Sequence, residues 1–184
     1  MSSDKKAIDT MVILGAGASA ADGAPIQTNL FLEFFKHCRA KGPYDATHEW
    51  DRELATFFSQ FFGIDVDNDD LDSVAFPTFE EILGILEIAA SQGESFRDLL
   101  GPHLIKNGTS QLWHIHDVLV FSIAEILHEK LKYGSSTHDR LIQSLRCIGG
   151  LERTAFTSFN YDILIDNALV DAVGEEGVDY GVAF

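Results

Sequence analysis

Apolar residues form two kinds of run along this chain: short continuous blocks and longer stretches that repeat every three to four residues. The continuous block is residues 11–14 (MVIL), and residues 154–159 (TAFTSF) form a second strand-like run that mixes apolar residues with Thr and Ser. Each ends at turn-forming residues, 15–19 (GAGAS) and 160–162 (NYD). A short apolar block bounded by turn residues is typical of a buried strand. The pattern therefore predicts two strands, each followed by a tight turn and a helix.

The longer stretches have the spacing of amphipathic helices. The predicted helices cover about residues 28–41, 50–62, 79–90, 112–132, 139–147 and 163–172. In the second of them Phe57, Phe58 and Phe61 are expected to face inward. Thr78 and Glu81 have the spacing of a capping box, and Gly149 is expected to end a helix. Fourteen phenylalanines are many for this length and predict a large aromatic core.

Strands that alternate with helices predict an α/β chain. We expect a Rossmann-like parallel sheet flanked by helices, with a helix-rich insertion between the first strand and the later ones, and residues 1–184 as a single domain. In a parallel sheet the two turns would open on the same carboxyl edge, where α/β proteins bind ligands.

The glycine turn points to a nucleotide as the first ligand to consider. Gly15 and Gly17 are expected to allow a positive φ and to let a ligand approach the main chain, where N–H groups at the next helix would favour phosphate. The dinucleotide fingerprint is incomplete, since Ala20 occupies the third position, although that substitution is tolerated. A purely structural glycine turn is the alternative.

Composition limits the other function classes. The chain has 184 residues and a net charge of −16, with its thirteen Lys and Arg scattered, which argues against direct nucleic-acid binding. Cys38 and Cys147 form no CxxC pair, so no zinc module is expected, and a reducing cytoplasm fits best. No apolar run has the length of a membrane span or a signal peptide.

Two clusters resemble metal sites, and neither has the required spacing. The acidic loop at residues 65–72 would need Gly and Glu where Asp70 and Phe76 stand. His114 and His116 are two residues apart on a predicted helix, where side chains do not face each other. No metal site is therefore expected.

Taken together, GAGAS at residues 15–19 and FTSFNYD at residues 156–162 resemble the SIR2-like (sirtuin-like) family, in particular its divergent bacterial branch of NAD-consuming domains. The segments Gly23-Ala24-Pro25 and 79–83 are also similar to that branch. The resemblance covers about residues 10–181 and depends on the order and spacing of several short motifs.

This resemblance implies NAD as a substrate that is split into nicotinamide and ADP-ribose. The residues implied to hold its diphosphate and adenosine side are Gly15, Ala16, Gly17 and Ser19. Asn160 would lie beside the nicotinamide ribose as the catalytic residue, and Asp162 would bond the carboxamide. The alternatives are a turn residue for Asn160 and a helix N-cap for Asp162.

In that branch such domains are often effectors of antiphage defence, which implies a C-terminal sensor domain or partner protein and a homo-oligomer. Two departures matter. Without Cys pairs the chain does not resemble protein deacylases, and no histidine follows Asp162, where the family carries a catalytic His-Gly motif. We expect the chain to end before that strand, and no general base is assigned.

Two other functions stay open. One is a non-catalytic module that binds NAD, ADP-ribose or partner proteins, which the missing histidine favours. The other is a Rossmann-type oxidoreductase, which needs an acidic residue at the end of a second strand about 20 residues past the glycines. Glu33 has that spacing but lies within a predicted helix.

Overall fold

The computed structural model describes residues 7–41, 49–93, 108–132 and 136–180. The chain divides into two compact units. The first, here called the sheet unit, comprises Met1–Ile26 and Lys130–Phe184, and the second, the helical unit, comprises Gln27–Glu129.

The sheet unit contains a two-stranded parallel sheet, in which β1 (Thr10–Leu14) pairs with β2 (Thr154–Ser158). The register places Leu14 opposite Ser158, so both strands end at the same edge. Parallel strands need a long connection, which the intervening helices supply. The described part of the chain is therefore helix-rich with a small parallel sheet, which is consistent with the predicted α/β class.

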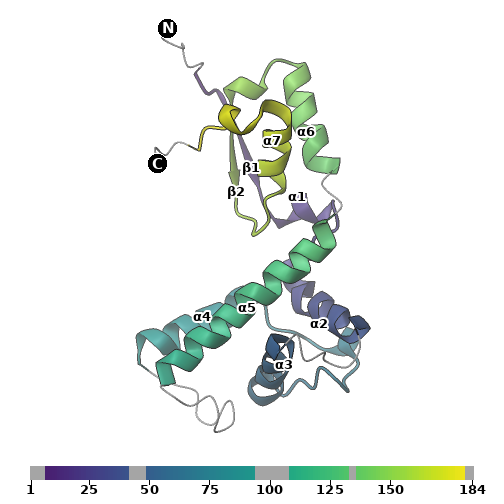
Figure 1. The fold of residues 1–184 in the computed structure, drawn as a ribbon, viewed down its shortest axis with the longest axis vertical. Helices are drawn as coiled ribbons and strands as arrows, with labels where there is room; N and C mark the ends of the chain where they lie inside the picture. Colours follow the sequence, from purple (N-terminus) through teal and green to yellow (C-terminus); the bar gives the residue numbers. More distant parts are fainter. Residues whose placement is uncertain (1–6, 42–48, 94–107, 133–135, 181–184) are drawn as a thin grey trace. The chain divides into compact units, whose positions relative to one another are not determined.

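Three helices complete the sheet unit, together with two 3₁₀ turns. They are α1 (Ala16–Ala20), α6 (Ser136–Cys147) and α7 (Leu164–Val173), with 3₁₀ turns at Leu151–Arg153 and Glu175–Gly177. Figure 1 shows α6 and α7 beside the two strands, and their small core contains Leu14, Ile142, Ile165 and Ala168. Val12 and Phe156 pack against this core from the sheet, whereas Met11 and Ile13, on the other face of β1, are exposed. The alternation follows from the two-residue period of a strand.

Over its described residues, the helical unit contains four helices. They are α2 (Leu30–Lys41), α3 (Glu49–Phe62), α4 (Phe79–Ser91) and α5 (Gly108–Leu131), with 3₁₀ turns at Gln27–Asn29 and Leu71–Ser73. One face of α2 is buried, with Leu30, Phe31, Phe34, Phe35 and Cys38 on it. Phe58, which is 0% exposed, packs edge-on against Phe31 and Phe35, with ring centroids 4.8 and 5.1 Å away. The expected aromatic core is therefore confirmed in this unit.

One inward assignment was wrong, because Phe61 is 39% exposed. Phe57 and Phe58 already fill the space under α3, and Phe61, in the last turn, stacks on the ring of Phe57 at 5.3 Å. The helix ends follow their local signals. Thr78 and Glu81 form both bonds of the capping box, and Gly149 has a φ of 68°. No described helix is long and apolar enough to cross a membrane.

Candidate functional site

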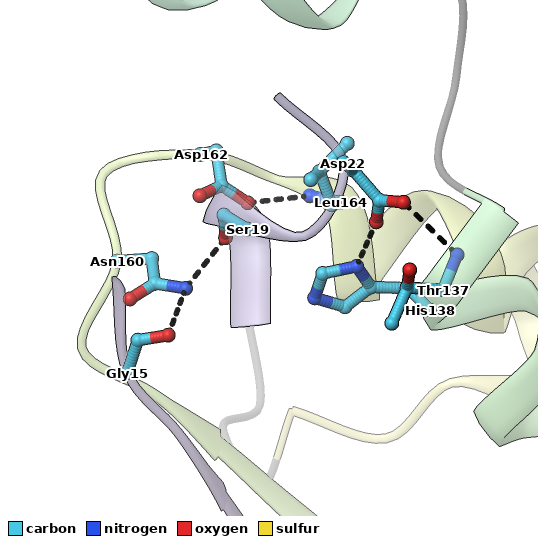
Figure 2. Close-up of polar contacts among 8 residues, drawn as sticks. All are labelled: Gly15, Ser19, Asp22, Thr137, His138, Asn160, Asp162 and Leu164. Carbon is cyan, nitrogen blue, oxygen red and sulfur yellow. Dashed lines mark hydrogen bonds and ion pairs between the residues drawn. The ribbon is translucent and has the colours of Figure 1, made fainter. Parts of the chain in front are cut away.

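The turns after β1 and β2 lie next to each other at the carboxyl edge of the sheet. The backbone N–H of Phe159 donates to the carbonyl of Leu14 at 3.1 Å, which continues the strand pairing into the turns. From there the side-chain amide of Asn160 donates to the carbonyl of Gly15 at 3.1 Å and to the hydroxyl of Ser19 at 2.7 Å (Figure 2). Two motifs that are 145 residues apart in the sequence are thus joined by one side chain.

The orientation of the Asn160 amide follows from its partners. A carbonyl can only accept, so the Nδ2 group must face Gly15 and the Oδ1 atom must point away from it. This Oδ1 atom is buried and has no hydrogen-bond partner among the described residues. A buried acceptor without a partner costs about 1–3 kcal/mol, which a ligand hydroxyl or a water would recover.

Ser19 connects Asn160 to the chain that follows α1. Its side chain is buried, with 2% of the residue exposed, and its hydroxyl accepts from Asn160. Its carbonyl accepts from the backbone N–H groups of Asp22 at 3.0 Å and Ala24 at 3.1 Å. Ser19 is thus bonded both to the turn after α1, through its carbonyl, and to Asn160, through its hydroxyl.

The glycines do not have the backbone role expected of them. Gly15 is extended, with φ −121° and ψ −179°, Gly17 lies within α1, and neither has a positive φ. The expected positive φ was wrong, because the chain passes from strand to helix through one extended residue without a reversal. A Cβ atom added at Gly15 or Gly17 would meet no other atom within 4 Å. Neither packing nor backbone strain requires glycine here, and the bare backbone is open to an approaching group.

Asp162 lies one residue before the N-cap of α7, which is Ile163. Its Oδ1 atom accepts from the backbone N–H of Leu164, the first residue of α7, at 3.1 Å (Figure 2). The alternative of Asp162 as the N-cap was therefore wrong by one residue, although its side chain does bond the start of the helix. A carboxylate has four lone-pair sites, so this bond leaves it able to accept another donor.

A buried histidine–aspartate pair lies near Asn160, and no sequence motif indicated it. Nδ1 of His138 lies 3.0 Å from Oδ2 of Asp22, and the backbone N–H of Thr137 donates to Oδ1 at 3.1 Å (Figure 2). The side chains of His138 and Asp22 are 2% and 3% exposed. The two residues are 116 positions apart, so only the fold brings them together.

The side chains of the other candidate clusters contact groups within the helical unit. Nε2 of His114 lies 2.6 Å from the Glu53 carboxylate on α3, whereas His116 contacts the adjacent Asp117. Among the residues that the structure describes, no three His, Cys, Asp or Glu side chains gather as metal ligands would. In the acidic loop, hydrogen bonds lower the pKa of the Asp65 carboxyl. The largest contribution is the bond from the Asn68 side chain.

Comparison of the chain with protein-family models, curated proteins and solved structures found no match.

Proposed function

We propose that the chain binds NAD at the junction of β1 and β2 and splits it into nicotinamide and ADP-ribose. The observation that carries this proposal is the Asn160 side chain, which joins both motifs and leaves a buried acceptor without a partner beside two open glycines. A nucleotide offers ribose hydroxyls to such an acceptor and a diphosphate to bare backbone N–H groups.

The diphosphate would lie against Gly15, Ala16 and Gly17. The first N–H groups of a helix have no partner within it, so those at the start of α1 are available donors. Because α1 has only five residues, its dipole is small, and we assign the contact to individual N–H groups rather than to the helix as a whole. The bare glycines would allow the phosphate oxygens to approach closely.

Asn160 and Asp162 would take the nicotinamide side. Oδ1 of Asn160 would accept from a ribose hydroxyl or a water, and the carboxylate of Asp162 would accept from the carboxamide while keeping its bond from the N–H of Leu164. Loss of nicotinamide leaves positive charge on the ribose, so the chain has to position the substrate, stabilise that charge and admit water. Fixed oxygen dipoles such as that of Asn160 favour a developing cation.

The wider proposal follows the sequence resemblance. The sheet unit would belong to a Rossmann-like parallel sheet of the SIR2-like type, and the chain would act in the cytoplasm as an effector in antiphage defence. Its partners would be a sensor domain or protein and further copies of itself.

Binding without turnover is the second candidate, and one observation favours it. His138 is 2% exposed and its Nδ1 atom lies against the Asp22 carboxylate, so it does not offer an imidazole to a substrate. The chain would then hold NAD or ADP-ribose without a general base.

The test is to incubate the protein with NAD and to follow both nicotinamide release and the NAD-dependent shift of the unfolding temperature. Release that is lost in Asn160→Ala and kept in Asn167→Ala, an exposed asparagine on α7, supports hydrolysis. A thermal shift without release supports the binding module. If NAD produces neither nicotinamide release nor a thermal shift, both proposals are overturned.

A further inference from the structure

The contacts of the sheet unit form a continuous path from α6 to Asn160. The first turn of α6 holds the Asp22 carboxylate through the N–H of Thr137 and the imidazole of His138. The backbone N–H of Asp22 donates to Ser19, and the Ser19 hydroxyl accepts from Asn160. Figure 2 shows these groups in sequence, with the Asp22 carboxylate facing α6 and the Asn160 amide facing Ser19.

Burial makes the α6 end of this path rigid. A buried carboxylate is tolerated only when hydrogen-bond donors surround it, and Asp22 is 3% exposed. When the Asp22 carboxylate is ionised it can only accept, and the Nδ1 atom of His138 is then the donor in their bond. The turn after α1 therefore has one well-defined position on α6.

The Asn160 end depends on that position. The amide is held by two bonds, to Gly15 and Ser19, and the shorter is the 2.7 Å bond to the Ser19 hydroxyl. The terminal torsion of an asparagine is intrinsically broad, so these bonds decide where the Oδ1 atom points. If Ser19 were displaced, only the bond to Gly15 would hold the amide, and the direction of the Oδ1 atom would be less restrained.

We propose that Asp22 and His138 are positioning residues that orient the Asn160 amide through Ser19 and thereby set the affinity of the site for NAD. This inference rests on the proposed function for its ligand, whereas the orientation of Asn160 can be measured without any ligand. Neither residue is assigned a contact with the substrate.

The experiment combines two readouts on uniformly ¹⁵N-labelled full chain. The side-chain amide signals of Asn160 are identified by their absence in Asn160→Ala, and NAD affinity is measured by calorimetry. In Asp22→Ala we expect the Asn160 amide signals to move and the Kd for NAD to rise about tenfold, the equivalent of one lost hydrogen bond. Asp22→Asn keeps an acceptor oxygen and is expected to show smaller changes in both. Asp171→Ala, an exposed aspartate on α7, is the matched control and should change neither.

A purely structural role gives a different result. If Asp22→Ala lowers the unfolding temperature but leaves the Asn160 amide signals and the Kd unchanged in the folded protein, the inference is overturned. Should Asp22→Ala fail to fold, Asp22→Asn and His138→Gln decide by the same readouts. If the wild-type chain does not bind NAD, the proposed function fails, while the amide signals still test the positioning role.

Discussion

Gly17 offers a substitution that separates binding from folding. Gly17 lies within α1, and a Cβ atom there would meet no other atom within 4 Å. Alanine is the best helix former and glycine among the poorest, so Gly17→Ala is expected to raise the free energy of unfolding by up to about 1 kcal/mol. Glycine at this position therefore has no benefit for stability that the structure reveals.

A ligand on the backbone would respond in the opposite direction. A diphosphate that touches the Gly17 main chain would be displaced by the new methyl group and would lose one or two of its N–H bonds. Hydrogen bonds to charged groups contribute about 1.5–3 kcal/mol each, so the Kd for NAD should rise at least about tenfold. The same substitution would thus stabilise the fold and weaken the site.

The assay pairs urea denaturation with calorimetric titration of NAD. Gly84→Ala is the matched control, since Gly84 lies within α4 of the helical unit and has the same open space around its Cβ position. It should stabilise the chain without changing NAD affinity. Unchanged affinity in Gly17→Ala would refute the assignment of the glycine turn, and a large loss of stability would refute the packing argument.

Four further predictions concern stability and thiol chemistry. Phe58→Ala should lower the free energy of unfolding by about 3–5 kcal/mol in urea titrations, because the ring is fully buried among aromatic neighbours; a loss below 1 kcal/mol would contradict this. Thr78→Ala should cost about 1 kcal/mol through the lost N-cap. The backbone N–H of Thr78, together with its hydroxyl, holds the pKa of the Glu81 carboxyl below its ordinary 4.5. The contact therefore stabilises the fold fully above pH 4.5, and this stabilisation is lost as the pH falls through the lowered pKa. Thermal unfolding between pH 3 and 7 should show the unfolding temperature falling on the acid side. Burial raises the pKa of the Cys38 thiol well above its ordinary 9.0, whereas Cys147 is exposed, so a thiol reagent at pH 8 should modify one cysteine rapidly in the native chain and two in denaturant.

The elements could be predicted because their signals are local. The three-to-four spacing of α2 and the capping box of α4 are decided within a few residues, and both were confirmed. The start of α6 was predicted wrongly, since the helix begins three residues earlier than expected. Residues 136–138 are polar and show no hydrophobic periodicity that would indicate a helix. Phe61 was misplaced because burial in a last helical turn depends on what packs beside it, which spacing alone does not specify.

The site could be predicted as far as topology allowed. Parallel pairing brings the turns after both strands to one edge, and Asn160 indeed contacts Gly15 and Ser19. The conformation of Gly15 was missed, because a Gly-x-Gly pattern does not say whether glycine supplies a positive φ or only a missing side chain. The Asp22–His138 pair could not be predicted from the sequence around either residue, because each has the pattern of an ordinary polar residue at a helix end.

The most direct test of the central claim is a crystal structure of the chain with NAD. We expect the diphosphate to lie against the backbone of Gly15–Gly17, with a ribose hydroxyl or a water within hydrogen-bond distance of Oδ1 of Asn160. NAD bound elsewhere, or an Asn160 acceptor satisfied by another protein group while NAD fails to bind at millimolar concentration, would contradict it.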